Sequence, residues 1–269
     1  MKITREETII VTGASSGIGA AIVAKLRRPG RQVFATMRRP IPEKHGPDAI
    51  AMDVSSDESV ATAVATVLGR TGRIDAIVNN AGVDLIGAVE ETTTDESLAL
   101  FQTNFFGVHR LTRAVLPLMR SQHSGRIVTI GSIAGFLTQP YQSFYCSAKY
   151  ALEGYVESLD YEVRPFGIRA LLIQPGFIRT NLNANRVGAA SNLEVYARAR
   201  SDVLNTMTRD VGNGASPQAV AAAVEKVIVA RNPALRTRVG ADAHQLYILR
   251  HLLPPALFRM GIRRRLHAD

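Results

Sequence analysis

The feature that most constrains this chain is a regular alternation of short apolar runs, rich in β-branched residues, with longer segments of helix length. The apolar runs lie at 8–12, 32–37, 48–52, 74–79, 126–131 and 168–174, with a weaker run at 235–240. Runs of this length and composition are typical of strands that are buried on both faces, as in a parallel sheet. The pattern therefore predicts a parallel sheet of about seven strands.

The segments between these runs have the length and the boundary residues of helices. Ser55 and Glu58 have the spacing of a capping box, and Ser216 followed by Pro217 marks a later helix start. Because right-handed crossovers place helices on both faces of a parallel sheet, the expected fold is α/β, a Rossmann-type doubly wound sheet. No repeat or linker divides residues 1–269, which are expected to form a single domain. Helices are expected at 18–28, from Ser55 onward, at 94–122, at 141–166 and at 216–230.

Two segments lie outside the alternation. Residues 179–215 form an insertion after the sixth run, with a helix expected at 193–207, and insertions of this length are usually substrate lids or binding loops. Residues 241–269 form a C-terminal extension that is partly apolar and is interrupted by Pro254-Pro255. This extension could close over a site, extend a subunit interface or lie on a membrane surface, and the sequence leaves these options open.

The charge balance and the cysteine count bear on partners and location. Lys and Arg number 32 against 23 Asp and Glu, a formal net charge of +9, but only the arginines at 259 and 263–265 form a cluster. Without a recognition helix or a run of stacking aromatic residues, nucleic acid is not an expected partner. The single cysteine, Cys146, excludes an intrachain disulfide and a Cys-rich metal cluster, and no metal is expected. We expect a soluble cytoplasmic protein, because neither a signal peptide nor an apolar stretch of ~20 residues is found.

A glycine-rich turn directly follows the first apolar run and precedes a helix. It reads Thr12-Gly13-Ala14-Ser15-Ser16-Gly17-Ile18-Gly19. Glycines at a strand-to-helix turn let the backbone approach a pyrophosphate, whose charge is stabilised by the free N–H groups of the helix N-terminus. A plain tight turn is the alternative explanation of this loop taken alone.

Further motifs stand at the carboxyl ends of the expected strands, where ligands bind in open α/β sheets. Asn79-Asn80-Ala81-Gly82 ends the fourth run and Ser132 follows the fifth. Tyr145 and Lys149 are four residues apart on an expected helix, which places both side chains on one face.

Together with the glycine loop, Asn104 and Pro175-Gly176 followed by Thr180, these motifs occur in the order and at the spacing of a known family. Over residues 8–240 the chain resembles the short-chain dehydrogenase/reductase family. The stretches TMRR at 36–39 and VHRLTRAVLPLMR at 108–120 look similar to the branch that contains 17β-hydroxysteroid and retinol dehydrogenases.

The resemblance implies a catalytic set of Asn104, Ser132, Tyr145 and Lys149. Ser132 would hold the substrate oxygen, and Tyr145 would give or take the proton while a nicotinamide cofactor carries the hydride. Because a phenol with a pKa of about 10 is a poor acid at neutral pH, the nearby Lys149 is expected to stabilise the phenolate and lower the pKa of Tyr145. In the family, the lysine also contacts the nicotinamide ribose, and Asn104 helps to hold a water that links the lysine to solvent. A buried amide at a helix end is the alternative for Asn104.

The resemblance also implies a set of cofactor-binding residues. Asp53 would contact the adenine ring and Thr180 the nicotinamide carboxamide; the plainer alternatives are a helix-start aspartate and a turn-capping hydroxyl. The full set is Gly13, Ser15, Ser16, Gly17, Ile18, Gly19, Arg38, Arg39, Asp53, Val54, Asn80, Ala81, Gly82, Tyr145, Lys149, Pro175, Gly176 and Thr180.

The expected cofactor is NADP(H) rather than NAD(H). An NAD site needs a carboxylate near the end of the second strand to bind the ribose 2′-hydroxyl. No Asp or Glu occurs between Thr8 and Pro42, and Arg38-Arg39 follows the strand directly. Guanidinium groups suit a 2′-phosphate, and Ser15 offers one more donor. The alternative is that both arginines are solvated surface residues.

These features predict an NADP(H)-dependent oxidoreductase that interconverts a secondary alcohol and a ketone or aldehyde, on a bulky apolar substrate. The alternative is a catalytically silent nicotinamide-binding regulator or scaffold on the same fold. The resemblance further implies a homodimer or homotetramer, assembled through the helices expected at 94–122 and 141–166.

Overall fold

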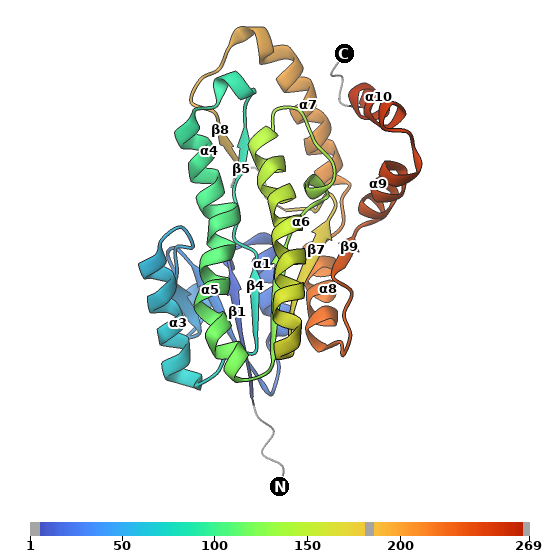
Figure 1. The fold of residues 1–269 in the computed structure, drawn as a ribbon. Coiled ribbons are helices and arrows are strands. Elements are labelled where there is room, and N and C mark those ends of the chain that lie inside the picture. The colour runs from blue at the N-terminus through green and yellow to red at the C-terminus, as the bar shows by residue number, and fades with distance from the viewer. Residues whose placement is uncertain (1–5, 181–185, 266–269) are drawn as a thin grey trace.

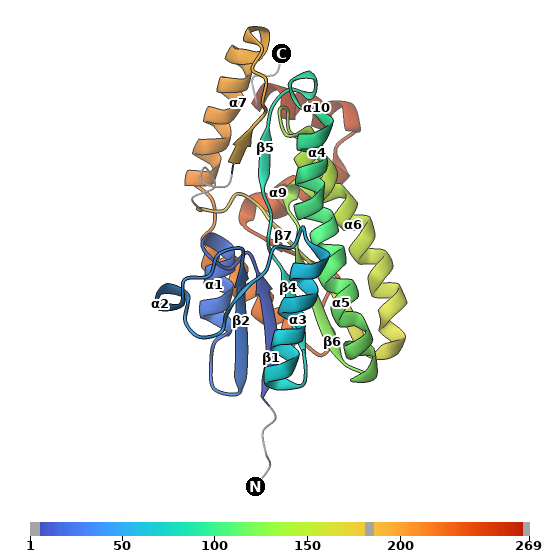
Figure 2. The same ribbon diagram turned by 90° about the vertical axis from the view of Figure 1, so that its left-hand side faces the viewer.

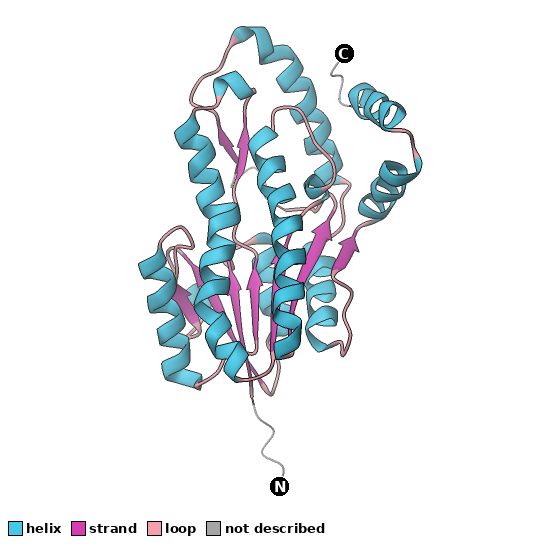
Figure 3. Cartoon of the chain, viewed as in Figure 1, coloured by secondary structure: helices cyan, strands magenta, loops and turns pink. Residues whose placement is uncertain are grey.

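The computed structural model describes residues 6–180 and 186–265, and its centre is a parallel sheet of seven strands in the order β3-β2-β1-β4-β6-β7-β9. Every neighbouring pair in this sheet is parallel, as the apolar runs predict. Figure 3 shows that the arrows of the sheet point to one end of the molecule. The strands are β1 Glu7–Thr12, β2 Arg31–Met37, β3 Ala49–Ala51, β4 Ala76–Asn79, β6 Gly125–Ile130, β7 Ile168–Pro175 and β9 Arg236–Val239.

The helices lie on both faces of the sheet, so the doubly wound α/β prediction is confirmed. Figures 1 and 2 show α3, α5 and α6 on one face and α1 and α8 on the other. Four helices lie above the carboxyl ends of the strands or beyond β9 (Figure 1): α4, α7, α9 and α10. The helix bounds are α1 Gly17–Leu26, α2 Pro42–His45, α3 Asp57–Thr71, α4 Thr94–Phe101, α5 Gly107–Ser121, α6 Ser143–Val163, α7 Glu194–Gly212, α8 Pro217–Val229, α9 Ala241–Leu252 and α10 Pro255–Arg265.

Alternate residues of each strand supply the two hydrophobic cores. In β1, Ile9 and Val11 pack into the core under α1 and α8, whereas Ile10 packs into the core under α3, α5 and α6. All three side chains are fully buried, as expected because side chains of a strand point alternately to its two faces. The continuous apolar character of the runs therefore follows from burial on both sides.

The order of the strands creates a switch point between β1 and β4. From β1 the chain moves outward to β2 and β3, and then returns to place β4 on the other side of β1. Ligands of open α/β sheets bind in the crevice at such a point, outside the carboxyl ends of the strands. The loops that follow β1 and β4 are the glycine loop and the Asn79 to Gly82 motif.

Several local features differ from the sequence-based expectations. The helix α3 is capped by Ser56, whose Oγ accepts a hydrogen bond from the backbone N–H of Ser59, and not by Ser55. The segment expected as one helix at 94–122 contains a π-helical turn, η2, at Gln102–Phe106 between α4 and α5. A second parallel sheet, formed by β5 Asp84–Ile86 and β8 Arg186–Gly188, was not expected. Three short 3₁₀ helices complete the fold: η1 Val89–Glu91, η3 Ile133–Gly135 and η4 Arg164–Phe166.

Candidate active site

The turn between β1 and α1 has the backbone shape that a dinucleotide requires. Gly13 and Gly17 have φ angles of 63° and 55°, in the left-handed region that favours glycine. A Cβ on Gly19 would lie 2.3 Å from the carbonyl oxygen of Gly13, so no larger residue fits there. The first turn of α1 contains no acidic residue, and no side chain caps it at Ser16. The helix therefore begins without a capping side chain or an acid at its N-terminus, and the residues of the turn fit a pyrophosphate.

Thr12 and Asn80 connect the two loops at the switch point. The hydroxyl of Thr12 accepts hydrogen bonds from the backbone N–H groups of Asn80 and Ala81, both at 3.0 Å. The amide of Asn80 donates to the carbonyl oxygens of Thr12 and Gly13 at 2.9 and 3.1 Å. These four bonds fix the glycine loop against the end of β4.

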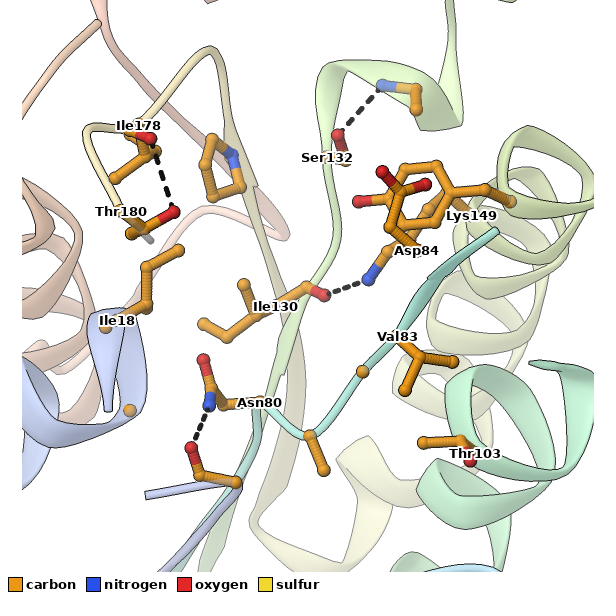
Figure 4. A pocket seen from close by; sticks show the side chains of 18 of the residues that line it. Ile18, Asn80, Val83, Asp84, Thr103, Ile130, Ser132, Lys149, Ile178 and Thr180 are labelled. Atoms are coloured by element: carbon orange, nitrogen blue, oxygen red, sulfur yellow. Dashed lines mark hydrogen bonds between the residues drawn. The ribbon is translucent and has the colours of Figure 1, made fainter. Parts of the chain in front are cut away.

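A cavity of about 820 Å³ opens above this point and contains most of the expected site residues. Figure 4 shows it with Ile18, Asn80 and Thr180 toward one side and Ser132, Asp84 and Lys149 toward the other. Two expected residues do not line it: Asn104 and Arg39. Those that do are Gly13, Ser15, Ser16, Gly17, Ile18, Gly19, Arg38, Asp53, Val54, Asn80, Ala81, Gly82, Ser132, Tyr145, Lys149, Pro175, Gly176 and Thr180.

A smaller hollow beside the cavity is formed by Ser15, Met37, Arg38 and Arg39. Both arginines are exposed. The hollow thus joins the loop after β1 to the end of β2, with two guanidinium groups, one hydroxyl and no carboxylate among its lining residues.

Ser132, Tyr145 and Lys149 meet at the other end of the cavity. Ser132 follows β6, and its Oγ accepts a hydrogen bond of 3.1 Å from the backbone N–H of Ala134. Lys149 is buried, and its Nζ donates to the carbonyl oxygen of Ile130 at 2.9 Å. The same Nζ lies 5.7 Å from the centre of the Tyr145 ring, as expected for side chains four residues apart on α6.

The pKa values of this group differ from the sequence-based expectation. The pKa of Tyr145 is raised, first by burial and then by the charge of Asp84, while a hydrogen bond with Ser132 acts in the opposite direction. Burial lowers the pKa of Lys149 to about 8. The expectation that Lys149 lowers the pKa of Tyr145 is thus wrong, because desolvation of both side chains dominates. The raised pKa keeps Tyr145 protonated at neutral pH.

Asn104 lies in the π-helical turn and is almost completely buried. Its Oδ1 accepts a hydrogen bond from the N–H of Val83, and its Nδ2 donates to the carbonyl oxygen of Val83, at 2.8 and 2.9 Å. Asn104 therefore fixes the chain between β4 and β5, and the neighbouring Thr103 lines the cavity instead. The alternative, a buried amide at a helix end, is wrong about the helix end, because the helical path continues through Asn104.

The motifs after β3 and β7 lie at the cavity wall. Asp53 accepts two hydrogen bonds from Ser55, from its N–H at 2.9 Å and its Oγ at 2.6 Å, which lower the pKa of Asp53. A Cβ on Gly176 would lie 2.1 Å from Asp242, whose carboxylate accepts a hydrogen bond of 2.6 Å from the N–H of Phe177. The end of β7 is thus attached to the start of α9.

Polar residues that sequence reasoning missed also line the substrate side of the cavity. Asp84, Gln139 and Gln142 are buried there. The Nε2 of Gln142 donates to Oδ1 of Asp84 at 2.7 Å. An acid inside the apolar stretch that follows the Asn79 to Gly82 motif is the signal that could have identified Asp84 from the sequence.

The insertion at 179–215 supplies one wall of the cavity through α7. Its residues Met207, Val211 and Gly212 line the cavity, and α7 ends five residues later than expected. Glu91, with 1% exposure, pairs with Arg200 of α7 and accepts a hydrogen bond of 2.7 Å from the N–H of Leu193. Residues 181–185 of the expected lid lie outside the described part of the chain.

The C-terminal extension forms two helices that pack beside this wall. Ala243 and Leu246 of α9 and Phe258 of α10 form an apolar cluster with Ile133 and Leu137, directly after Ser132. Ile262 of α10 contacts this cluster and also the cluster that contains Met207 of α7.

No helix in the described parts of the chain combines the length and the apolar character that a membrane span requires. Among the same residues, no three His, Cys, Asp or Glu side chains are grouped so that they could hold a metal.

Comparison with known proteins decides the family. The family model for short chain dehydrogenases matches residues 7–190. The chain belongs to the short-chain dehydrogenase/reductase family. Its members are oxidoreductases that act on CH–OH or carbonyl groups with NAD(P), and the glycine turn and the cavity of this chain fit such a cofactor.

Individual relatives agree in length as well as in sequence. A 3-ketodihydrosphingosine reductase of Bacteroides thetaiotaomicron is 37% identical over 243 residues, which are 90% of each chain. Retinol dehydrogenase 8 of Bos taurus is 32% identical over 275 residues, 92% of this chain and 86% of the relative. The crystal structure of a short-chain dehydrogenase from Streptomyces avermitilis is 36% identical and superposes with a TM-score of 0.80 over 96% of this chain and 95% of the other.

Proposed function

We propose that this oxidoreductase uses NADP(H) and interconverts a secondary alcohol and a ketone or aldehyde on a bulky apolar substrate. The observation that carries the proposal is the convergence of Ser132, Tyr145 and Lys149 at one end of the cavity whose other end is the glycine turn. A silent regulator or scaffold is the alternative, but it gives no reason for a buried lysine held 5.7 Å from a tyrosine ring. Burying a lysine is costly, so its burial at this place favours a chemical role.

In this proposal each residue has a distinct task in carbonyl reduction. The hydroxyl of Ser132 binds the carbonyl oxygen of the substrate, with the Ala134 N–H bond fixing its position. Tyr145 donates its proton to the same oxygen, and its raised pKa keeps it in the donating form at neutral pH. Lys149 stabilises the phenolate that remains, because its ammonium lies one helical turn away. The bound nicotinamide would supply the hydride in this direction and accept it in the other.

The hollow formed by Ser15, Arg38 and Arg39 supports NADP(H) over NAD(H). A 2′-phosphate there would meet two guanidinium groups and a hydroxyl, and no carboxylate of the hollow would repel it. Asp53, which binds Ser55 beside this hollow, is the candidate for the adenine. The side chain of Thr180 lies next to Gly17, with its Cγ2 3.5 Å from the place of a Cβ on Gly17, and Thr180 is the candidate for the nicotinamide carboxamide.

The substrate side of the cavity supports a bulky apolar substrate. Ile133, Phe177, Met207 and Val211 line it. The names of the relatives, a 3-ketodihydrosphingosine reductase and a retinol dehydrogenase, also favour a large apolar alcohol or ketone. We assign the insertion at 179–215 as a substrate lid and the extension at 241–269 as a support that packs against it, both parts of a single domain.

A homodimer or homotetramer is proposed, assembled through the face formed by α6 and by α4 and α5, which follow each other end to end beside α6 in Figures 1 and 2. Leu98 of α4, Phe106 of the intervening turn η2 and Tyr161 of α6 are exposed. Light scattering coupled to gel filtration tests the oligomeric state, and a monomer at micromolar concentration would contradict the proposed assembly.

The proposed location is the cytoplasm. A reducing compartment suits the thiol of Cys146, because burial raises its pKa to about 11.

The experiment for the proposed function is a panel of ketones, steroids, retinoids and aliphatic aldehydes, assayed with NADPH and NADH side by side. We expect turnover with a preference for NADPH of at least ~10-fold in kcat/KM, about 1.4 kcal/mol. Replacing Met37→Asp together with Arg38→Ala should shift the preference toward NADH. A wild-type preference for NADH would contradict the cofactor assignment, and turnover of no carbonyl compound would contradict the proposed reaction.

A further inference from the structure

The two C-terminal helices, α9 and α10, pack against the rest of the chain with one side. Figure 1 shows the pair at an edge of the molecule, beyond β9. This inner side contains Leu246 of α9 and Phe258 of α10, which are buried in the apolar cluster that follows Ser132. The helix α10 is also held by the ion pair between its Arg265 and Asp210 of α7. The inner contacts therefore fix the helix pair to the body of the protein and leave its outer side to another role.

The outer side of this helix pair is apolar. Residues 251–257, which join the end of α9 to the start of α10, are all exposed, and six of these seven residues are apolar. Leu252 is 76% exposed, and Ile248, four residues earlier on the same face of α9, is exposed as well. On α10 the exposed Leu257 and Met260 are three residues apart and share a face in the same way. A continuous group of exposed apolar side chains marks an interaction site.

Cations border this apolar side, and the segment that forms it contains no acid. Residues 243–265 include five arginines and no Asp or Glu. Arg259 and Arg264 are exposed, and among the described residues neither guanidinium group forms an ion pair or a hydrogen bond. Arg264 follows Met260 by four residues, so it lies beside the apolar face of α10. Apolar side chains bordered by cations are complementary to a bilayer that contains anionic lipid, whose phosphates lie next to an apolar interior.

The same charges disfavour a second copy of this chain as the occupant of the outer side. A two-fold contact brings the same surface of both copies together, so Arg259 and Arg264 of one copy would meet the arginines of the other. Residues 243–265 offer no acid to pair with them, and like charges in an interface are repulsive. Anionic lipid supplies the negative charge that a second copy of this surface lacks.

We infer that the outer side of α9 and α10 docks on the surface of a bilayer that contains anionic lipid. The leucines at 252–257 insert among the acyl chains, while the guanidinium groups of Arg259 and Arg264 bind lipid phosphates. Ile133 and Phe177 line the cavity and also belong to the apolar contacts under the helix pair, so docking holds the cavity close to the bilayer. The inference goes beyond the proposed function and does not depend on it.

Sedimentation of the full chain with sucrose-loaded vesicles tests the inference. One set of vesicles is phosphatidylcholine alone, and the other contains about 30% phosphatidylserine. We expect the partition coefficient to be at least about 10-fold larger on the anionic vesicles, and to fall as added salt screens the arginines. Arg259→Gln with Arg264→Gln should lower binding to the anionic vesicles at least about 10-fold, because two cations near the surface are lost. Leu252→Asn with Leu257→Asn should lower it at least as much, because two apolar side chains no longer leave water.

Matched controls carry the same changes on other surfaces. Arg120→Gln with Arg231→Gln removes two exposed arginines that lie outside the helix pair. Ile41→Asn with Val229→Asn replaces two apolar side chains that are 50% and 55% exposed. Both controls should bind the anionic vesicles within about 2-fold of the wild type, because they leave the docking surface unchanged. Thermal unfolding of every variant at the wild-type temperature shows that the changes act on binding and not on folding.

Three results would overturn the inference. They are a wild type that stays in the supernatant with anionic vesicles, equal binding to both kinds of vesicle, and equal losses in the test and control variants. If the wild type binds no vesicles and Leu252→Asn with Leu257→Asn dissociates an oligomer in light scattering, the outer side is an interface between copies instead. None of these measurements needs turnover, so failure of the proposed reaction leaves the inference standing, and failure of docking leaves the proposed reaction standing.

Discussion

The Nζ of Lys149 lies 5.7 Å from the centre of the Tyr145 ring and is held there by the carbonyl oxygen of Ile130 at the end of β6. This relationship ties the helix α6, which carries both side chains, to the central sheet. The bond also sets the distance between a cation and a phenol in a desolvated place, where charges interact strongly.

The pH dependence of kcat/KM for NADPH should report the protonation state of Lys149. Its pKa is lowered to about 8, so the ammonium is present below pH 8 and is lost as the pH rises through that value. We predict that kcat/KM for NADPH, which reflects groups of the free enzyme, is level near pH 7 and falls about tenfold per pH unit well above 8. The measurement is a pH profile of initial rates at low NADPH. A profile that stays level up to pH 10 would contradict the assignment.

Gly19→Ala should impair cofactor binding. The added Cβ would lie 2.3 Å from the carbonyl oxygen of Gly13 and 2.6 Å from Nδ2 of Asn80, so the turn must shift. We expect the Kd of NADPH, followed by its fluorescence, to rise at least ~10-fold, the equivalent of 1.4 kcal/mol. Gly69→Ala is the control: no heavy atom lies within 4 Å of its Cβ position in α3, and alanine there should stabilise the helix by up to about 1 kcal/mol without changing Kd. An unchanged Kd for Gly19→Ala would argue against the pyrophosphate site.

Glu91→Gln should loosen the docking of α7. Glu91 is buried and pairs with Arg200, so the amide leaves a largely buried guanidinium without its counter-charge. Removing one partner of a fully buried ion pair typically costs about 3–5 kcal/mol of stability. The part of this cost that is local to α7 appears as more frequent opening of the helix. We predict faster trypsin cleavage at the arginines of α7, slowed again by NADPH plus substrate.

The matched control for this prediction is Glu194→Gln, an exposed acid in the first turn of the same helix. Its cleavage rate should equal that of the wild type. If Glu91→Gln is cut no faster than Glu194→Gln, the ion pair does not secure the lid. Equal cleavage of the wild type with and without ligands would contradict the lid itself.

Much of the fold could be predicted because its signals are local. Each central strand is a continuous apolar run, since both faces are buried, and Ile9, Ile10 and Val11 show this directly. The glycine turn could be predicted because positive φ angles and close backbone approaches demand glycine at fixed places. By contrast, β5 and β8 have three residues each and pair Asp84 with Arg186, a contact between distant parts of the chain that no local pattern encodes.

The sequence predicts which residues form the candidate site, but it does not predict their pKa values or all of their contacts. Ser132, Tyr145 and Lys149 do meet in one cavity, as spacing and family order predict. The direction of the Tyr145 pKa was missed because it depends on burial and on Asp84, which comes from another strand. The side-chain contacts of Asn104 with Val83 could not be predicted either, because they depend on the π-helical turn that directs its amide to the backbone between β4 and β5.

The replacement Tyr145→Phe tests the central claim most directly, because it removes only the hydroxyl proposed to give the proton. The measurement is kcat for NADPH-dependent reduction of a ketone that the wild type accepts, together with the Kd of NADPH from its fluorescence. The account predicts that kcat falls at least ~100-fold, the typical contribution of a general acid, while Kd changes less than about 3-fold. A variant that retains more than about a tenth of the wild-type kcat would contradict the assignment of Tyr145 as the acid.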